Sequence, residues 1–552
     1  MFKIKLKNHN SLEMNVGSIL NDILIESKLN DTVELPIILG EINDDILELS
    51  EKVECSGEFK PIDISYDIGK RAYIRTLLFV LIKATLDIFP KARITIEHSI
   101  SKGIFGEIKK DITLSADDLN AIKNRMKTII EEDIIIEKLE VSTKEAIEIF
   151  SQYNMLDKVK LLESLKIDRV KLYRLDGRYD YFYGPMAYSS GVLKSFDLIK
   201  YESGFLLRYP TDGKSLNIPK LNHYPKLNRI FKEAEEWGNI MEIPDVGSLN
   251  KLVEESKIAD MIRVNEGLQE KKIAYIADKI CSNKDVQLVF IAGPSSSGKT
   301  TFTKRLAIQL MANGKKPVQI SMDNYFVDRE VTPLDENGQR DFESIYAIDI
   351  ELFNNQLTQL IKGENIEMPT YDFILGTRVW KGETLQLEKN GIILIEGIHG
   401  LNECLSKDIS QNQKFKIYIS CLTQLNIDDH NRISTTDVRT VRRIVRDSIT
   451  RGYNAERTLT MWPSVRRGEE KNIFVFQEEA DVMFNSNLIY ELCVLKKYAL
   501  KELDIITKES PVYYEAKRLK SFLHFFEDVD EKLVPDDSLL REFIGGSYFY
   551  ED

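Results

Sequence analysis

Short apolar runs that alternate with amphipathic stretches dominate the second half of the chain. Residues 289–292 (VFIA), 317–321 (PVQIS) and 391–397 (GIILIEG) each have the pattern of a short buried strand, and residues 301–311 have the spacing of a helix. Buried strands that alternate with helices are typical of an α/β domain with a parallel sheet and helices on both faces. We therefore predict such a domain over residues 286–500.

The first half has a mixed pattern. Residues 2–6 alternate as in a strand, residues 18–28 have the pattern of a short amphipathic helix, and residues 33–39 and 46–53 are further strand-like runs. Residues 71–90 form a long helical pattern that is too charged at its edges to be a membrane span. These patterns predict small mixed domains in this half of the chain.

Breaks in the pattern divide the chain into five segments. We expect a small β-rich module at 1–62, an α+β domain at 63–245, a helical linker at 246–285, the α/β domain at 286–500, and a helical segment at 501–552. The predicted fold class is therefore multidomain α/β.

Composition narrows the classes of function. Of the 552 residues, 30% are charged and 43% hydrophobic, as in soluble globular proteins, and no apolar run approaches the length of a membrane span. The net charge of −13 argues against general polyanion binding, so an anionic substrate needs a local basic site. The five scattered cysteines are typical of free thiols in a reducing cytosol, and we predict a cytoplasmic protein.

The segment from residue 293 to residue 300, GPSSSGKT, fits the phosphate-binding pattern G-x-x-x-x-G-K-[ST] in full. It stands between a predicted strand and a predicted helix, where backbone N–H groups and the helix start attract phosphate. Lys299 can reach the β- and γ-phosphates, and the Thr300 hydroxyl can bind Mg²⁺. The predicted nucleotide-binding residues are Gly293, Pro294, Ser295, Ser296, Ser297, Gly298, Lys299, Thr300 and Thr301.

Two carboxylates follow the next predicted strands. Asp323 and Glu396 stand at the ends of the second and third strands, the edge at which open α/β sheets bind ligands. Asp323 can accept the proton of an attacking hydroxyl, and Glu396 can organise Mg²⁺. A loop-capping aspartate and a structural glutamate are the alternatives at these two positions.

Eight arginines and no lysine lie between residues 439 and 467. Arg439, Arg443 and Arg446 share one face of a predicted helix, with Arg442 beside them. A group of guanidinium ions suits a phosphoryl group that carries charge in the transition state. The alternative is an ordinary solvated helix.

Residues from about 286 to 500 resemble the uridine kinase/phosphoribulokinase family of P-loop kinases. The motifs GPSSSGKTT, SMDNYF, PTYDF, LIEGI and DVRTVRRIVRDSITRG stand in family order. The resemblance implies a P-loop NTPase fold, ATP and Mg²⁺ as cofactors, and roles for the following residues. Asp323, Lys299, Arg442 and Arg446 would be catalytic, Thr300 and Glu396 would serve the metal, and Glu343, Tyr371, Phe373 and Arg439 would bind the substrate.

Two positions depart from this family's pattern. Gly376 stands where eukaryotic-type uridine kinases have a histidine that reads the base, and Arg457 stands where a glutamine helps to read the pyrimidine. Phosphate chemistry is therefore predicted more firmly than uracil recognition.

The first half resembles the start of threonyl-tRNA synthetases. The pattern of residues 1–62 is similar to the ubiquitin-like TGS module, a β-grasp fold. Residues 63–245, with DYFYGPMAYSSG, are similar to the synthetase's second additional, editing-type domain. That site uses histidines on a helix and a later Cys and His, whereas the helix at 71–89 has no histidine and Phe182 and Met186 hold the later two positions. We expect a scaffold without editing chemistry.

These observations predict an ATP-dependent nucleoside kinase that acts on a hydroxyl, with the 5′-hydroxyl of a nucleoside as the expected acceptor. A kinase of another sugar or of a pantothenate-like alcohol is the alternative within the same class. A nucleotide-dependent regulator that binds RNA or protein through its first half is the alternative from another class. RNA binding and self-association are left open, and no membrane partner is expected.

Overall fold

The computed structural model describes residues 2–6, 11–29, 33–335, 338–372, 374–423 and 425–550. Contacts within the chain divide it into two compact units. The first unit contains residues 1–223, 245–248 and 426–432, and the second contains residues 224–244, 249–425 and 433–552. The bounds of the five segments expected from the sequence stay predictions, and the return of residues 426–432 to the first unit was not among the expectations.

The first unit opens with a five-stranded sheet in the order β2-β1-β5-β3-β4. β1 and β5 are parallel and the other neighbours are antiparallel. Leu20, Ile23 and Leu24 of the helix share one core with Ile4 and Phe59 of the sheet. This arrangement confirms the ubiquitin-like β-grasp fold. The elements are β1 (Phe2–Leu6), β2 (Ser11–Met14), α1 (Leu20–Ser27), β3 (Ile37–Ile42), β4 (Asp45–Glu48) and β5 (Gly57–Asp63).

An α+β domain follows, as the resemblance implied. Its long helix α2 (Asp67–Ile88) includes the apolar run 77–82, which is buried against two sheets in the orders β11-β12-β7-β6 and β10-β9-β8. The other elements are β6 (Arg93–Ile100), β7 (Gly103–Lys109), α3 (Ala116–Glu131), β8 (Glu137–Ser142), α4 (Thr143–Gln152), α5 (Leu156–Ser164), β9 (Arg169–Leu175), β10 (Arg178–Asp180), β11 (Asp197–Tyr201) and β12 (Gly204–Arg208).

A small hairpin from much later in the chain completes this unit. It consists of β19 (Asn426–Asp428) and β20 (Asn431–Arg432). Lys158 on α5 lies 2.7 Å from a carboxylate oxygen of Asp428 and 3.1 Å from one of Asp180, and the side chains of all three are almost completely buried. The Nδ1 atom of His430 lies 2.7 Å from the second oxygen of Asp180. Charges that are removed from water must be paired, so this network fixes the hairpin in the first unit.

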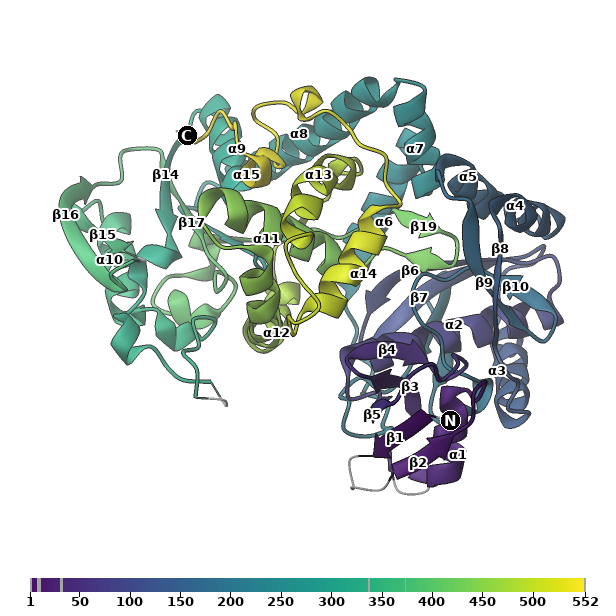
Figure 1. Ribbon diagram of the computed structural model, residues 1–552. Helices are drawn as coiled ribbons and strands as arrows, with labels where there is room; N and C mark the ends of the chain where they lie inside the picture. Colours follow the sequence, from purple (N-terminus) through teal and green to yellow (C-terminus); the bar gives the residue numbers. More distant parts are fainter. Residues whose placement is uncertain are drawn as a thin grey trace. The chain divides into compact units, whose positions relative to one another are not determined.

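The second unit is built on a parallel sheet in the order β14-β17-β13-β18-β21, of which β14 and β17 are labelled in Figure 1. The central strand β13 is completely buried, which explains its unbroken apolar sequence. Ile291 of β13 and Ser321 of β14 both pair with Glu396 of β17, so the carboxyl ends of these strands meet at one edge. The strands are β13 (Leu288–Ala292), β14 (Lys316–Ser321), β17 (Gly391–Glu396), β18 (Lys414–Ser420) and β21 (Val482–Asn485).

Helices cover this sheet, and the predicted P-loop NTPase fold is confirmed. The helix expected at 301–311 is α9, which begins two residues earlier, and the helical linker expected at 246–285 contains two helices, α7 and α8. The elements are α6 (Pro225–Met241), α7 (Val246–Glu254), α8 (Ile258–Ser282), α9 (Lys299–Ala312), α10 (Ile350–Ile361), β15 (Ile366–Asp372), β16 (Thr377–Leu385), α11 (Thr435–Thr450), α12 (Ala455–Asn472), α13 (Glu491–Leu503), α14 (Tyr513–Leu523) and α15 (Arg541–Ile544). Among the described residues, no helix combines the length and apolar character needed to cross a bilayer.

Candidate active site

The phosphate-binding loop runs from the end of β13 to the start of α9. A side chain at Gly293 would place its Cβ 2.0 Å from the carbonyl oxygen of Ile419, so only glycine fits there. Gly298 has a φ of +81°, which glycine adopts without strain. The buried hydroxyls of Ser296 and Ser297 have no hydrogen-bond partner among the described residues. Unpaired buried donors beside a helix start fit a loop whose hydrogen bonds are completed by bound phosphate.

Lys299 and Thr300 begin α9 and lie beside Glu396, as the sequence predicted for a metal and phosphate site. The Thr300 hydroxyl donates a hydrogen bond of 3.0 Å to Glu396, and the Lys299 ammonium donates one of 3.1 Å to the carbonyl of Pro294. Burial lowers the pKa of Lys299, against the opposing charges of Glu396 and Glu542. Burial raises the pKa of Glu396 to about 7. A divalent cation between Thr300 and Glu396 would restore the ionised carboxylate, so both residues fit Mg²⁺.

Asp323 lies just past the carboxyl end of β14, in the short turn Met322–Tyr325. Its side chain is open to solvent, although the surrounding protein raises its pKa. Lys299, Arg451 and Arg446 are close enough to oppose this rise. An accessible carboxylate beside the phosphate loop can accept a proton from a substrate hydroxyl.

Glu343 is a second carboxylate with a raised pKa, at about 7, because it is buried and close to Glu469. Its Oε2 atom is buried and has no hydrogen-bond partner among the described residues. A Cβ atom at Gly468 would lie 2.4 Å from the Cβ of Glu343, so α12 packs directly against this side chain. An unpaired buried carboxylate oxygen suits a ligand that donates a hydroxyl.

An aromatic group lies next to this part of the site. Tyr371 of β15 is buried, and its ring meets that of Phe326 edge to face at 5.6 Å. Phe326 meets Phe342, the neighbour of Glu343, in the same way at 6.3 Å. The predicted Phe373 lies outside the described residues. The substrate roles of Glu343, Tyr371 and Phe373 stay predictions.

Arginine side chains of helix α11 support the phosphate loop by hydrogen bonds to the loop's backbone. Arg439 is buried, pairs with Glu469, and donates from Nε to the carbonyl of Ser295 at 2.9 Å. Glu469 in turn accepts from the N–H of Ser295 at 3.1 Å. Arg442 is completely buried, pairs with Glu491 and approaches the carbonyl of Ser296 at 3.4 Å.

Because of these contacts, Arg439 and Arg442 are not part of a group of free guanidinium ions. Arg442 is completely buried, and Arg439 donates hydrogen bonds to Glu469 and to the loop. Arg446 pairs with Asp447 at 2.8 Å, and its charge also acts on Lys299 and Asp323. The catalytic roles of Arg442 and Arg446 and the substrate role of Arg439 therefore stay predictions.

Two parts of the site were missed by reasoning from the sequence. His399, three residues after Glu396, is buried, with its ring close to the backbone of Ser344. Burial lowers its pKa to about 4, so the ring is neutral at physiological pH. Glu542 of the C-terminal segment accepts a hydrogen bond of 3.0 Å from the N–H of Thr301. A histidine directly after the LIEGI motif was a signal that could have been used, whereas nothing local marked Glu542.

In the first unit, core residues occupy the two positions at which the similar synthetase domain has its Cys and His. Phe182 is buried, with its ring 5.3 Å from that of Phe79 on α2, and Met186 is buried beside it in the same core. The backbone N–H of Met186 donates to Glu48 at 2.9 Å. Apolar side chains at these positions have no atoms suited to hold zinc or to activate water.

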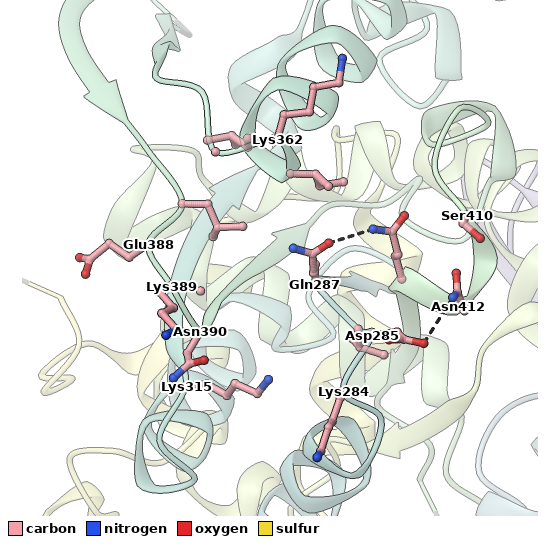
Figure 2. A pocket seen from close by; sticks show the side chains of 17 residues that line it. Lys284, Asp285, Gln287, Lys315, Lys362, Glu388, Lys389, Asn390, Ser410 and Asn412 are labelled. Carbon is pink, nitrogen blue, oxygen red and sulfur yellow. Dashed lines mark hydrogen bonds between the residues drawn. The ribbon is translucent and has the colours of Figure 1, made fainter.

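A polar hollow of about 730 Å³ lies away from the phosphate loop (Figure 2). Its lining includes residues 284–287 before β13, 387–391 at the start of β17, and Ser410, Asn412 and Gln413 before β18, which lie at the amino ends of these strands. Side chains from these segments bond to one another, as Gln413 does to Gln287 at 2.8 Å. Because α/β sheets bind ligands at the carboxyl ends of their strands, we place the active site at the opposite edge.

The second unit is similar in sequence to known proteins. The model of the Phosphoribulokinase / Uridine kinase family matches residues 288–488. A uridine kinase from Lactobacillus helveticus is 31% identical over 175 residues, which are 32% of this chain and 74% of that kinase. A solved structure titled as a possible uridine kinase from Bacillus stearothermophilus is 20% identical, with 39% of this chain and 98% of that chain covered and a TM-score of 0.28.

The N-terminal similarity is independent of the kinase match. A threonine–tRNA ligase from Carboxydothermus hydrogenoformans is 28% identical over 169 residues, which are 30% of this chain. The chain spans only 27% of the length of that ligase. This similarity supports the TGS-like and editing-like folds of the first unit. The uridine kinase that is 31% identical is covered over 74% of its length, and the family model matches residues 288–488 of this chain. The chain therefore belongs to the Phosphoribulokinase / Uridine kinase family.

Proposed function

We propose that the second unit transfers the γ-phosphoryl group of ATP to a hydroxyl group of a small molecule, and that this molecule is a nucleoside with its 5′-hydroxyl as acceptor. The observation that carries the proposal is the meeting of Lys299, Thr300 and Glu396 with Asp323 at the carboxyl edge of one parallel sheet. Phosphoryl transfer depends on positioning and on charge stabilisation, and this edge offers residues for both.

Each residue has a distinct task in this reaction. When bound, ATP supplies the phosphoryl group and Mg²⁺ neutralises part of its charge. The Lys299 ammonium stabilises the β- and γ-phosphate oxygens, and Thr300 and Glu396 hold the metal. The Asp323 carboxylate accepts the proton of the acceptor's hydroxyl as the oxygen attacks phosphorus. Arg439 and Arg442 keep the loop backbone in place.

The nucleoside as acceptor is supported by the named relatives and by the unpaired oxygen of Glu343, which suits sugar hydroxyls. Recognition of uracil has less support, because Gly376 and Arg457 replace the expected base-reading residues. Another sugar or a pantothenate-like alcohol is the alternative acceptor. The cytoplasmic location stays a prediction, and RNA binding and self-association stay open.

A screen for ADP release tests the proposal. Full-length protein with Mg²⁺ and ATP is offered nucleosides, other sugars and pantothenate-like alcohols one at a time, and the product is identified by mass. We expect a nucleoside 5′-monophosphate from the wild type and none from Lys299→Ala, with its melting temperature unchanged. If a different alcohol yields the phosphorylated product, that alcohol and not a nucleoside is the acceptor. ATP turnover that responds to RNA and to none of the alcohols would favour a regulator instead.

A further inference from the structure

The start of α9 already carries a negative charge, and it comes from the C-terminal segment. Thr301 is the third residue of α9, so its N–H has no acceptor within the helix. The Glu542 carboxylate accepts from this N–H at 3.0 Å, and the Tyr550 hydroxyl lies 3.1 Å from that of Thr301. Figure 1 shows the C-terminal stretch, with α15, beside the start of α9.

Packing keeps this carboxylate in position. Leu539, Leu540 and Phe543, which flank Glu542, are completely buried, and Leu539 is the side chain nearest to the position that a Cβ of Gly298 would occupy, at 3.6 Å. The ring of Phe543 lies 4.9 Å from the guanidinium of Arg442, the residue that supports the loop from behind. Glu542 itself is only half buried, so its side chain can turn toward solvent while the segment remains packed.

The position of the carboxylate is one that a nucleotide needs. Helix-start N–H groups bind phosphate oxygens in loops of this type, and one N–H group cannot donate fully to a phosphate and to Glu542 at the same place. Glu542 also adds a negative charge beside Glu396 and Lys299. Two buried hydroxyls of the same loop, those of Ser296 and Ser297, still lack a partner among the described residues. The hydrogen bonds of the loop are therefore complete at the N–H of Thr301 and incomplete at the hydroxyls of Ser296 and Ser297 among the described residues.

We infer that Glu542 is an internal competitor of the nucleotide: its carboxylate occupies the phosphate-binding N–H of Thr301 and must turn away before ATP or ADP binds. The inference rests on the proposed function only for the assignment of this loop to nucleotide phosphate. It gives the C-terminal segment, which carries no motif, a role in setting nucleotide affinity. A signal that draws Glu542 away would activate the enzyme without a change in its core.

Direct binding of ADP to the full-length protein tests this inference, measured by calorimetry with and without Mg²⁺. Glu542→Gln removes the charge, Glu542→Ala removes the hydrogen bond as well, and Asp536→Asn removes an exposed carboxylate from the same segment as a control. We expect both Glu542 variants to bind ADP roughly three- to tenfold more tightly than the wild type, the scale of an anion at a helix start. The control should match the wild type.

The opposite results are equally clear. If Glu542 only caps α9, its variants will melt at a lower temperature and bind ADP no more tightly, which would overturn the inference. Weaker binding that appears only with Mg²⁺ would make Glu542 a metal-site residue and would also overturn it. ADP affinity is measured without an acceptor, so the result does not depend on whether a nucleoside is phosphorylated. A kinase with unchanged ADP affinity in the variants would keep the proposed function and lose only the inference.

Discussion

Asp323 stands at the end of a strand with its side chain open to solvent, and the short turn in which it lies is capped by Ser321 and not by Asp323 itself. The structure therefore supports a capping role for Asp323 less than the sequence alone did. The carboxylate is accessible for the proposed role as base, and Lys299 and Arg446 oppose the rise of its pKa that burial causes.

We predict that Asp323→Asn lowers kcat by about 10²-fold or more, because the amide keeps the shape and loses the basicity. ATP affinity should change little, since the loop and Lys299 remain, so the loss is confined to the transition state. Single-turnover rate, ATP affinity and melting temperature are measured on the same protein. The exposed Glu330→Gln is the control, and a destabilised Asp323 variant with normal chemistry would contradict the role as base.

Glu343 carries a cost in stability that its proposed role in substrate binding would explain. Its pKa is about 7 in the folded protein, above the ordinary value of 4.5, so the folded state binds the proton more tightly than the unfolded chain. Stability is therefore lost as the pH rises from the ordinary pKa to the folded one, and the full penalty is present above pH 7. A buried, unpaired carboxylate that is retained at such a cost is typical of a binding site.

We predict that Glu343→Gln stabilises the fold at pH 8 by on the order of 1–3 kcal/mol and has little effect at pH 5, where the wild-type side chain is protonated. The same variant should bind the acceptor less well, because a charged acceptor for its hydroxyls is lost. Urea unfolding at both pH values and the KM of the acceptor check the two effects. Glu364→Gln, an exposed change in the same unit, should show neither effect, and equal stabilisation at pH 5 and pH 8 would refute the titration argument.

Helix α11 has the arginine pattern of a catalytic element, but two of its arginines support the backbone of the phosphate loop. Its arginines follow the spacing that favours a phosphate-binding face, yet Arg439 and Arg442 pair with buried carboxylates of α12 and α13. Arg439 and Glu469 together hold both the carbonyl and the N–H of Ser295. One ion pair thus fixes the orientation of the two peptide units on either side of the Ser295 Cα atom in the phosphate loop.

We predict that Arg439→Met destabilises the protein by about 3–5 kcal/mol, because Glu469 is left buried with too little positive charge around it. The double change Arg439→Met with Glu469→Met should recover most of that stability, since a buried pair can be replaced by apolar residues. Nucleotide affinity should stay low in the double variant, because Ser295 has lost both contacts. Recovery of stability and affinity together would show that the pair does not position the loop. Arg467→Met, at a half-exposed side chain, is the control.

Local patterns carried the prediction of the elements, and long-range contacts limited it. The phosphate loop, β13, β17 and α9 could be predicted because each is defined by its own local sequence pattern. Glu542 could not, because 241 residues separate it from Thr301 and its own sequence is unremarkable. The arginine pattern was correctly placed on a helix, but nothing in that pattern indicates which carboxylates pair with it.

At the scale of the whole molecule, the chain enters the first unit a last time at residues 426–432 and leaves it two residues before α11. Each of the three segments of the first unit brings its own residues to one folded body, and Asp428 and His430 reach partners more than 200 residues away in sequence. Domain boundaries drawn from composition cannot detect such a return, because seven residues carry no compositional signal.

This arrangement predicts two thermal transitions that respond to different changes. Lys158→Met leaves Asp180 and Asp428 buried without their shared cation, so the transition of the first unit should fall by about 10 °C, from a loss of about 3–5 kcal/mol. ADP should raise only the transition of the second unit, because a ligand stabilises the body that binds it. Differential scanning calorimetry on wild type, Lys158→Met and the exposed control Lys144→Met, with and without ADP, separates the two responses. A single transition that moves with both changes would show that the two units unfold as one, and the buried network around Lys158 would then stabilise the kinase as well as the N-terminal half.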